Sequence, residues 1–398
     1  MASIPEETAA IDHQLAKLAS QWTTRLAAYR AALHDEVEAI DVLDRFGETE
    51  TTFVLMGWAP AHKVKQIESA ILETTGDVAL VRPFPLSPEL EKRVPIALDN
   101  PRPVQPFETL VQLLSLPRYG ESDPTRLMAL FMPIFFGMML GDLGYGLILL
   151  ALCLVARRRL ASRTARDILT VLSYGAGWTI VFGILFGEAF GTLGEYLGMR
   201  ALWFERASPE HVSGLLLMTL AVGAIHLVLG LVIGVWEAAK EKSRSHLFER
   251  GGMLVGLVAL FAVVGTLTDM LPEGLLTPAV GVLILGIVLL SVPLGWVGLL
   301  MGPVEFIGLI GNVLSYLRIA AIGLASIYLA QVANEMAGKI GNLVVGAIVA
   351  VLLHALNLVM GTFSPTIHSL RLHYVEFFRK FYQGGGRPYQ PFGSRLEE

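Results

Sequence analysis

The 398-residue sequence predicts a mainly α, polytopic membrane protein with a small α+β cytoplasmic region at its N-terminus. Composition is the first reason, since 54% of the residues are hydrophobic, only 16% are charged and the mean hydropathy is +0.58. Soluble domains carry roughly 25% charged residues. The second reason is that long apolar segments follow one another from Leu127 to the C-terminal region. Most of the chain is therefore expected in lipid.

Several classes of function are disfavoured by the same composition. The net charge of -5 argues against nucleic acid as a partner, and the single cysteine, Cys153, excludes a disulfide framework or a thiolate metal cluster. Neither a G-x-x-x-x-G-K-[ST] phosphate loop nor an H-E-x-x-H motif occurs, so we expect no nucleotide site. Three histidines, His354, His368 and His373, lack carboxylate or cysteine ligands at metal-site spacing. We expect neither a metal nor a cofactor.

The first 48 residues are predicted to form a helical coiled-coil or helix-hairpin arm. Their apolar side chains recur with a mostly alternating spacing of three and four, which places them on one helical stripe. The stripe consists of Ile11, Leu15, Leu18, Trp22, Leu26, Tyr29, Leu33, Val37 and Ile40. No cleavable signal peptide is recognised in the first hundred residues, so membrane insertion is expected to depend on later segments.

Residues 49–115 are predicted to form a small α/β cytoplasmic lobe followed by a proline-rich linker. A strand-like run at 53–56, a helix-like stretch after Pro60 and a second run at 78–81 suggest a β-α-β unit. Prolines then recur from Pro83 to Pro106, which is typical of an extended linker.

Residues 116–382 are predicted to form the membrane domain, with about eight helices and a cytoplasmic tail at 383–398. Each apolar segment reaches the about 20 helical residues that a bilayer requires. The basic loops at 157–166 and 240–250 are expected inside and the loop at 269–278 outside, which leaves both termini cytoplasmic. The last two helices are expected to be long and tilted. The segments are 127–155, 168–187, 212–236, 251–268, 279–300, 309–333 and 343–375.

The first apolar segment is expected to be a hairpin of two short helices. Its centre runs from Gly137 to Gly146 and contains Asp142, and glycines with a carboxylate suit a turn that is buried among helices. A single crossing would also leave the N-terminal region outside. The alternative is one kinked helix in which Asp142 is a hydrogen-bonded structural residue.

Arg318 is the most informative residue, because it lies in the middle of the apolar run 309–333. A guanidinium stays protonated and is costly in hydrocarbon, so its presence indicates a passing charge or a water-filled path. Its helical face is mostly small, which would let another helix approach. The alternative is a structural ion pair with Glu305 or Glu188. The residues of that face are Gly311, Leu314, Ser315, Ala321, Ile322 and Ala325.

Further polar residues at membrane depth are candidates for ion half-channels. Arg371 is the second candidate cation, although an arginine near a helix end can also extend to the membrane interface. The helix that carries it exceeds the length of an upright span, so it is tilted or broken near Pro365. The carboxylate, histidine and amide candidates are Glu188, Glu305, His354, Asn357, His368 and Glu376.

Four ordered motifs resemble those of the membrane subunit of rotary V-type and archaeal-type ATPases, called subunit a or, in prokaryotes, subunit I. They are residues 117–125 (PRYGESDPT), 135–146 (FFGMMLGDLGYG), 311–318 (GNVLSYLR) and 368–386, which ends in FYQGGG. With a weaker match at Gly57-Trp58-Ala59-Pro60, the resemblance extends from about residue 50 to the C-terminus.

The resemblance implies a stator subunit against which a ring of c-type proteolipid subunits rotates. In that family two half-channels connect the ring carboxylates with the two sides of the membrane, and two functional arginines correspond to Arg318 and Arg371. The implied partners are the c-ring, the peripheral stalks and the membrane adaptor of the central stalk. The subunit would not be an enzyme by itself. Whether H⁺ or Na⁺ moves depends on the ring, which is another chain.

Two departures from the family pattern accompany the resemblance. Only about 115 residues precede the membrane domain, so attachment of the peripheral stalks becomes an open question. The eukaryotic pattern has a histidine two turns beyond the first arginine, where this chain has Ser326. A proton-relay role at that position is therefore not expected.

Two other classes of function remain alternatives. A secondary transporter would use interrupted helices such as the 127–155 hairpin, but the sequence shows no second interrupted hairpin and no internal repeat. A non-pumping membrane scaffold derived from the family is the other alternative. We expect an integral, multi-pass protein of a prokaryotic cell membrane.

Overall fold

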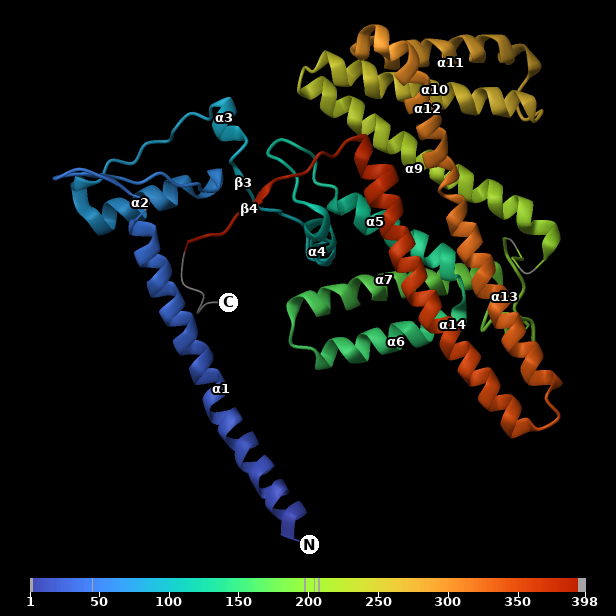
Figure 1. Cartoon of the computed structure of the whole chain (residues 1–398), viewed down its shortest axis with the longest axis horizontal. Helices are drawn as coiled ribbons and strands as arrows, with labels where there is room; N and C mark the ends of the chain where they lie inside the picture. The colour runs from blue at the N-terminus through green and yellow to red at the C-terminus, as the bar shows by residue number, and fades with distance from the viewer. Residues whose placement is uncertain (1–2, 45, 197, 204, 207, 393–398) are drawn as a thin grey trace. The chain divides into compact units, whose positions relative to one another are not determined.

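Two units make up the chain in the computed structural model: residues 1–97 with 387–398, and residues 98–386 (Figure 1). The structure describes residues 3–44, 46–196, 198–203, 205–206 and 208–392. The mainly helical, membrane-type fold predicted from the sequence is confirmed.

The N-terminal unit consists of one long helix and a few short elements. Helix α1 is followed by two short strands that pair antiparallel, and strands β3 and β4 pair in parallel. The predicted second strand at 78–81 is wrong, because Gly76 ends α2 with a positive φ of 65° and Val78 lies in a 3₁₀ turn. The elements are α1 (Ser3–Leu43), β1 (Gly47–Glu48), β2 (Phe53–Val54), α2 (Val64–Thr75), α3 (Pro88–Glu91), β3 (Pro95–Ile96) and β4 (Arg387–Pro388).

The second unit is built almost entirely of helices, and neighbouring helices pair as hairpins. Helices α6 and α7 run side by side, as do α10 and α11, and α13 packs against α14 (Figure 1). Helix α5 packs against α7 and also contacts α13 and α14. The helices are α4 (Gln105–Leu114), α5 (Thr125–Leu140), α6 (Leu143–Arg159), α7 (Arg163–Phe186), α8 (Leu193–Tyr196), α9 (Val212–Lys240), α10 (Arg244–Leu267), α11 (Leu276–Ser291), α12 (Gly298–Leu314), α13 (Leu317–Lys339) and α14 (Leu343–Arg371).

Five helical stretches of the described chain are long and apolar enough to cross a membrane. The fourth is 67 residues long and includes several consecutive helices. The shorter α5 is also apolar. These findings make the chain a multi-pass membrane protein. The stretches are Arg163–Phe186, Pro209–Lys240, Arg244–Leu267, Glu273–Lys339 and Leu343–Lys380.

The predicted hairpin in the first apolar segment is present as α5 and α6. Gly141 ends α5 in the left-handed region, with φ 42° and ψ 45°, and Asp142 caps the start of α6 by accepting a hydrogen bond from Tyr145 N at 3.0 Å. The alternative of one kinked helix is wrong. Helix α7 approaches this turn closely, because a Cβ on Gly183 would lie 2.2 Å from Leu143 N.

The bounds predicted for the segments 279–300 and 309–333 are wrong. Helix α11 ends at Ser291, and a 3₁₀ stretch, Val292–Val297, leads into α12. Within that stretch Gly295 has φ 60° and ψ -138°, which turns the chain. The residues on both sides of the turn are apolar, so hydropathy alone does not reveal the break. A second, milder break separates α12 from α13 at Ser315 and Tyr316.

Helix α14 continues through Pro365 without a break and ends at Arg371. The alternative of a helix broken near Pro365 is therefore wrong. A π-helical turn, Leu372–Phe377, follows directly and leads into a short 3₁₀ turn. The chain then returns to the start of the second unit.

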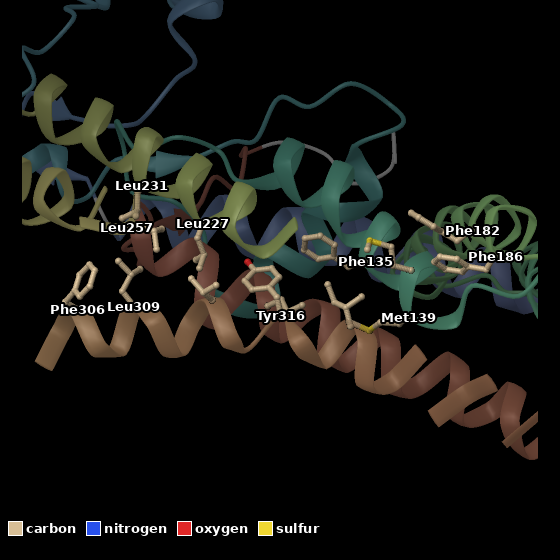
Figure 2. Close-up of a cluster of buried hydrophobic side chains, with 14 of the residues drawn as sticks. Phe135, Met139, Phe182, Phe186, Leu227, Leu231, Leu257, Phe306, Leu309 and Tyr316 are labelled. Carbon is tan, nitrogen blue, oxygen red and sulfur yellow. The ribbon is translucent and has the colours of Figure 1, made fainter. Parts of the chain in front are cut away.

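The main apolar core of the second unit lies between α5, α7, α9, α10 and α12 (Figure 2). Tyr316 lies at the break between α12 and α13 and points toward α9, where its hydroxyl lies 2.7 Å from Nδ1 of His226 (Figure 2). The core thus fixes the chain just before Arg318. Its labelled members are Phe135, Met139, Phe182, Phe186, Leu227, Leu231, Leu257, Phe306, Leu309 and Tyr316.

Two segments that are far apart in the sequence, 115–121 and 382–386, are joined by hydrogen bonds. The hydroxyl of Tyr382 donates to Ser115 O at 2.5 Å, and Gly386 N donates to Leu116 O at 2.9 Å. Gly384 N also donates to a carboxylate oxygen of Glu121 at 3.2 Å. Burial raises the pKa of Tyr382, so the hydroxyl remains a donor. These bonds attach the chain that follows α14 to the segment that leads into α5.

Candidate functional site

Arg318 lies in the first turn of α13, two residues after the core residue Tyr316. Its side chain is only partly buried, with 19% of its surface exposed. Among the described residues Nη1 of Arg318 is buried and has no hydrogen-bond partner. The backbone at Arg318 is thus fixed by the core, but the hydrogen-bond donors of its guanidinium are not all used by its own chain.

The nearest carboxylate to Arg318 is Glu376, which the sequence named as a half-channel candidate. Nη1 of Arg318 lies 3.8 Å from Oε1 of Glu376, which is too long for a hydrogen bond. Glu376 is 2% exposed, and its Oε2 has no hydrogen-bond partner among the described residues. The alternative partners expected for Arg318, Glu305 and Glu188, are not the ones observed.

Arg371 and His368 belong to the same group of side chains. Both lie near the end of α14, close enough to Arg318 for the charges of the two arginines to act on their surroundings. Arg371 is exposed and His368 is partly exposed. The structure therefore brings together two arginines, a histidine and a carboxylate from α13 and the end of α14.

The π-helical turn after Arg371 explains how Glu376 reaches this group. In an α-helix, residues five apart face directions about 140° apart. A π turn closes hydrogen bonds between residues five apart, so Glu376 comes closer to the face that carries Arg371. Such turns are frequent at functional sites.

Behind this group lies a fully buried cluster of two histidines and aromatic rings. His226 stacks on Phe377 with ring centroids 3.8 Å apart, and its ring centroid lies 5.2 Å from that of His373. Both histidines are 0% exposed. His226 Nδ1 lies 2.7 Å from the Tyr316 hydroxyl, so the cluster connects α9 with the residue that precedes α13. The cluster therefore packs directly against the Tyr316 side chain.

His354 and Asn357 form a separate network around Tyr145. His354 Nδ1 lies 2.6 Å from the Tyr145 hydroxyl, which also accepts a hydrogen bond from Asn357 Nδ2 at 3.0 Å. His354 Nε2 lies 3.0 Å from Asn334 Oδ1. Ser326 donates to Asn357 at 3.3 Å. This network connects α6, α13 and α14, and it is distinct from the group around Arg318.

Glu188 pairs with Arg206, a residue that the sequence analysis missed. Arg206 Nε donates to Oε1 of Glu188 at 2.9 Å, and Nη2 contacts Oε2. The guanidinium also donates to the last carbonyls of α5, including Gly141 O at 2.8 Å, and lies 4.5 Å from the Phe186 ring centroid. Arg206 is 1% exposed. It therefore caps α5 and neutralises Glu188.

A cavity of about 480 Å³ opens beside this ion pair. It lies between the loop that follows α7 and helix α13. Its lining includes Glu188, Thr192, Glu195, Arg200, His211 and Ile327. The polar lining makes the cavity suited to water.

Glu305 lies apart from the other candidates, on α12. It is close enough to Glu249 and Lys380 to be affected by their charges, and its Oε2 has no hydrogen-bond partner among the described residues. No group of three or more His, Cys, Asp or Glu side chains that could hold a metal ion is found in the described part of the chain.

The sequence motifs match an established family when the whole chain is compared. The sequence model of the V-type ATPase 116kDa subunit family matches residues 5–192 and 297–394. The matched ranges contain the α5–α6 hairpin and the group around Arg318. Arg206 lies between them, in the unmatched part.

The individual relatives that the chain resembles are subunits I of A-type ATP synthases. A-type ATP synthase subunit I of Methanocaldococcus jannaschii is 31% identical, over 99% of this chain and 63% of its own length. The subunit I of Archaeoglobus fulgidus is 32% identical, over 92% of this chain and 62% of its own length. The subunit I of Pyrococcus horikoshii is 30% identical, over 96% of this chain and 60% of its own length. This chain spans about three fifths of the length of these curated relatives.

Proposed function

The chain belongs to the V-type ATPase 116kDa subunit family, and we propose that it is the stator ion-channel subunit of a V/A-type rotary ATPase. In this role it binds no nucleotide itself. It provides two half-channels, and Arg318 interacts in turn with the carboxylates of a rotating c-ring. Peripheral stalk subunits and a central-stalk membrane adaptor complete the set of proposed partners.

One observation carries the proposal: Arg318 lies beside an exposed face of small side chains and is not saturated by its own chain. Gly311, Ala321 and Ala325 are exposed on that face, and a Cβ on Gly311 would meet nothing within 4 Å. A partner helix could approach closely there. The partly exposed guanidinium would then meet an acid on that helix.

The gate works by electrostatics. A protonated rotor carboxylate can face lipid, but beside Arg318 its ionised form is favoured, so it releases its proton into one half-channel. Because a guanidinium keeps its proton at all accessible pH values, Arg318 also blocks direct transfer between the half-channels. An ion can then cross only when the rotor turns.

Glu376 serves in this scheme as the resident counter-ion of Arg318. At 3.8 Å it lowers the cost of the cation in a medium of low dielectric constant without forming a hydrogen bond to it. A rotor acid can therefore displace Glu376 from the guanidinium without breaking a saturated pair. Arg371 adds a second positive charge close to the same path.

We assign the cavity beside Glu188 to the outer end of one half-channel. The loop between α7 and α9 lies between helices whose other ends carry the basic loops predicted to be cytoplasmic. Water in the cavity would reach Glu188 and Ile327, and Ile327 lies on α13, the helix of Arg318.

Cysteine labelling tests this assignment. A Thr192→Cys variant should react with a membrane-impermeant maleimide added from outside, and the label should lower ion flux. Tyr196→Cys is the matched control, because Tyr196 is 87% exposed on the same loop and does not line the cavity. Equal flux after labelling either cysteine would contradict the assignment of this cavity to a half-channel.

The proposed function as a whole is tested by purification and ion flux. The tagged chain should copurify with proteolipid and stalk subunits from native membranes. The purified complex, reconstituted in vesicles, should move H⁺ or Na⁺ when ATP is supplied, with Na⁺ and pH varied independently. A chain that purifies alone, or a complex without flux, would favour a scaffold.

A further inference from the structure

Helix α1 carries an exposed apolar stripe with a strict 11-residue repeat. Positions 11, 22 and 33 are apolar, as are 15, 26 and 37, and 18, 29 and 40. In the structure all nine side chains are exposed, from 46% for Trp22 to 63% for Tyr29. Within the described residues of its own unit, α1 forms no extensive contact with another helix or strand.

An exposed stripe of this length is typical of one strand of a coiled coil, because isolated helices owe little stability to their own propensity. An 11-residue repeat gives 3.67 residues per turn, slightly more than the 3.6 of an ideal helix. Sustained over three repeats, it favours a right-handed supercoil. A partner with ordinary heptads would lose register along α1.

The charges beside the stripe are sorted along the helix. Arg25 and Arg30 flank it in the middle of α1, and Glu36 and Asp41 flank it near the C-terminal end. The last turn of α1 has no basic residue. Acidic residues at a helix C-terminus oppose the helix dipole, so this order does not stabilise α1 alone. Flanking charges of coiled coils select the partner.

From these observations we propose that the α1 stripe docks an α-helix of another polypeptide. That helix has apolar residues in an 11-residue repeat, acidic residues beside Arg25 and Arg30, and basic residues beside Glu36 and Asp41. The pair forms a right-handed coiled coil. The proposal is independent of the ion gate, because it concerns only the N-terminal unit.

Designed peptides serve as probes of the full chain in lipid nanodiscs. The matched peptide has the 11-residue repeat and the complementary charges. A second peptide has the same repeat with the charges inverted, and a third has heptads with the complementary charges. We expect the matched peptide to bind at least tenfold more tightly than either of the others, and high salt should reduce the difference between the first two.

Two variants locate the interaction on the stripe. Leu26→Gln should weaken binding of the matched peptide at least tenfold, whereas Thr24→Gln, on the opposite face of α1, should leave it unchanged. Gln is compatible with a helix at either position. Circular dichroism of both variants reports whether the helix persists.

Other outcomes would overturn the proposal. Equal binding of all three peptides would show an unspecific apolar surface. A homodimer of the full chain that Leu26→Gln dissociates and Thr24→Gln does not would assign the stripe to a second copy. Loss of peptide binding in both variants would place the contact elsewhere.

Discussion

Two arginines of the second unit, Arg206 and Arg318, meet carboxylates in opposite ways. Arg206 is 1% exposed, contacts both oxygens of Glu188 and donates to carbonyls at the end of α5. Arg318 has 19% of its side chain exposed, and its Nη1 lies 3.8 Å from Glu376 with no hydrogen bond. A saturated buried cation stabilises a fold. A cation with unused donors beside an open face can exchange partners.

The largest effect is expected from breaking the saturated pair. Glu188→Ala leaves the Arg206 guanidinium buried without its counter-charge, which costs about 3–5 kcal/mol. We expect less folded protein in the membrane and a lower midpoint of thermal unfolding, measured on the protein purified in detergent. A double replacement of Glu188 and Arg206 by apolar residues should recover part of that stability. Full stability of Glu188→Ala would contradict the structural role of the pair.

The variant Asp142→Asn tests the turn between α5 and α6, which the pair of Arg206 and Glu188 also contacts. Its carboxylate accepts hydrogen bonds from Tyr145 N, Phe190 N and Gly191 N, at 3.0, 3.0 and 2.7 Å. The amide nitrogen of Asn cannot accept the bond that Oδ2 receives, so Asp142→Asn should cost about 1–3 kcal/mol. We expect reduced assembly, measured as the yield of complex. Normal assembly with defective flux would instead give Asp142 a role in conduction.

Arg371→Ala tests whether the second arginine near Arg318 contributes to ion flux. Arg371 is exposed and affects Arg318 only through charge, so its loss should lower ion flux by roughly tenfold, or about 1.4 kcal/mol, without abolishing it. Flux in reconstituted vesicles is the measurement. An unchanged rate would mean that Arg371 only extends to the membrane interface.

Glu376→Gln should have the smallest effect. Because the contact with Arg318 is long, stability should change little, but an unneutralised guanidinium should hold each rotor acid longer. We expect flux to fall by a few-fold, about 1 kcal/mol or less. Glu335→Gln is the control, since Glu335 pairs with Lys339 on an exposed face of α13, the helix that carries Arg318. Equal rates for both variants would remove the counter-ion role.

The same comparison shows what the sequence reveals. Arg318 could be singled out as a candidate because a charge inside a long apolar run is conspicuous, and the α5–α6 turn could be predicted because glycines surround Asp142. Arg206 could not, since its loop also contains Glu195, Arg200 and Glu205, and only tertiary packing buries one charge of several. The partner of Arg318 was missed because a π turn, invisible in hydropathy, reorients Glu376.

Breaks inside apolar sequence were hidden for a related reason. The stretch Val292–Val297 separates α11 from α12, although it contains no charged residue and its residues other than Pro293 and Gly295 are Val, Leu and Trp. Only the backbone of Gly295 departs from helical geometry there. Hydropathy reports the solvent around a segment, whereas a turn depends on a few dihedral angles.

The most direct test of the gate is ATP-driven ion flux through a reconstituted complex that carries Arg318→Ala, with the amount of assembled complex measured in the same vesicles. We predict flux at the background level together with normal assembly, because the open face loses the guanidinium proposed to face the rotor acids while the core at Tyr316 is unchanged. Flux near that of the unmodified complex would contradict the account.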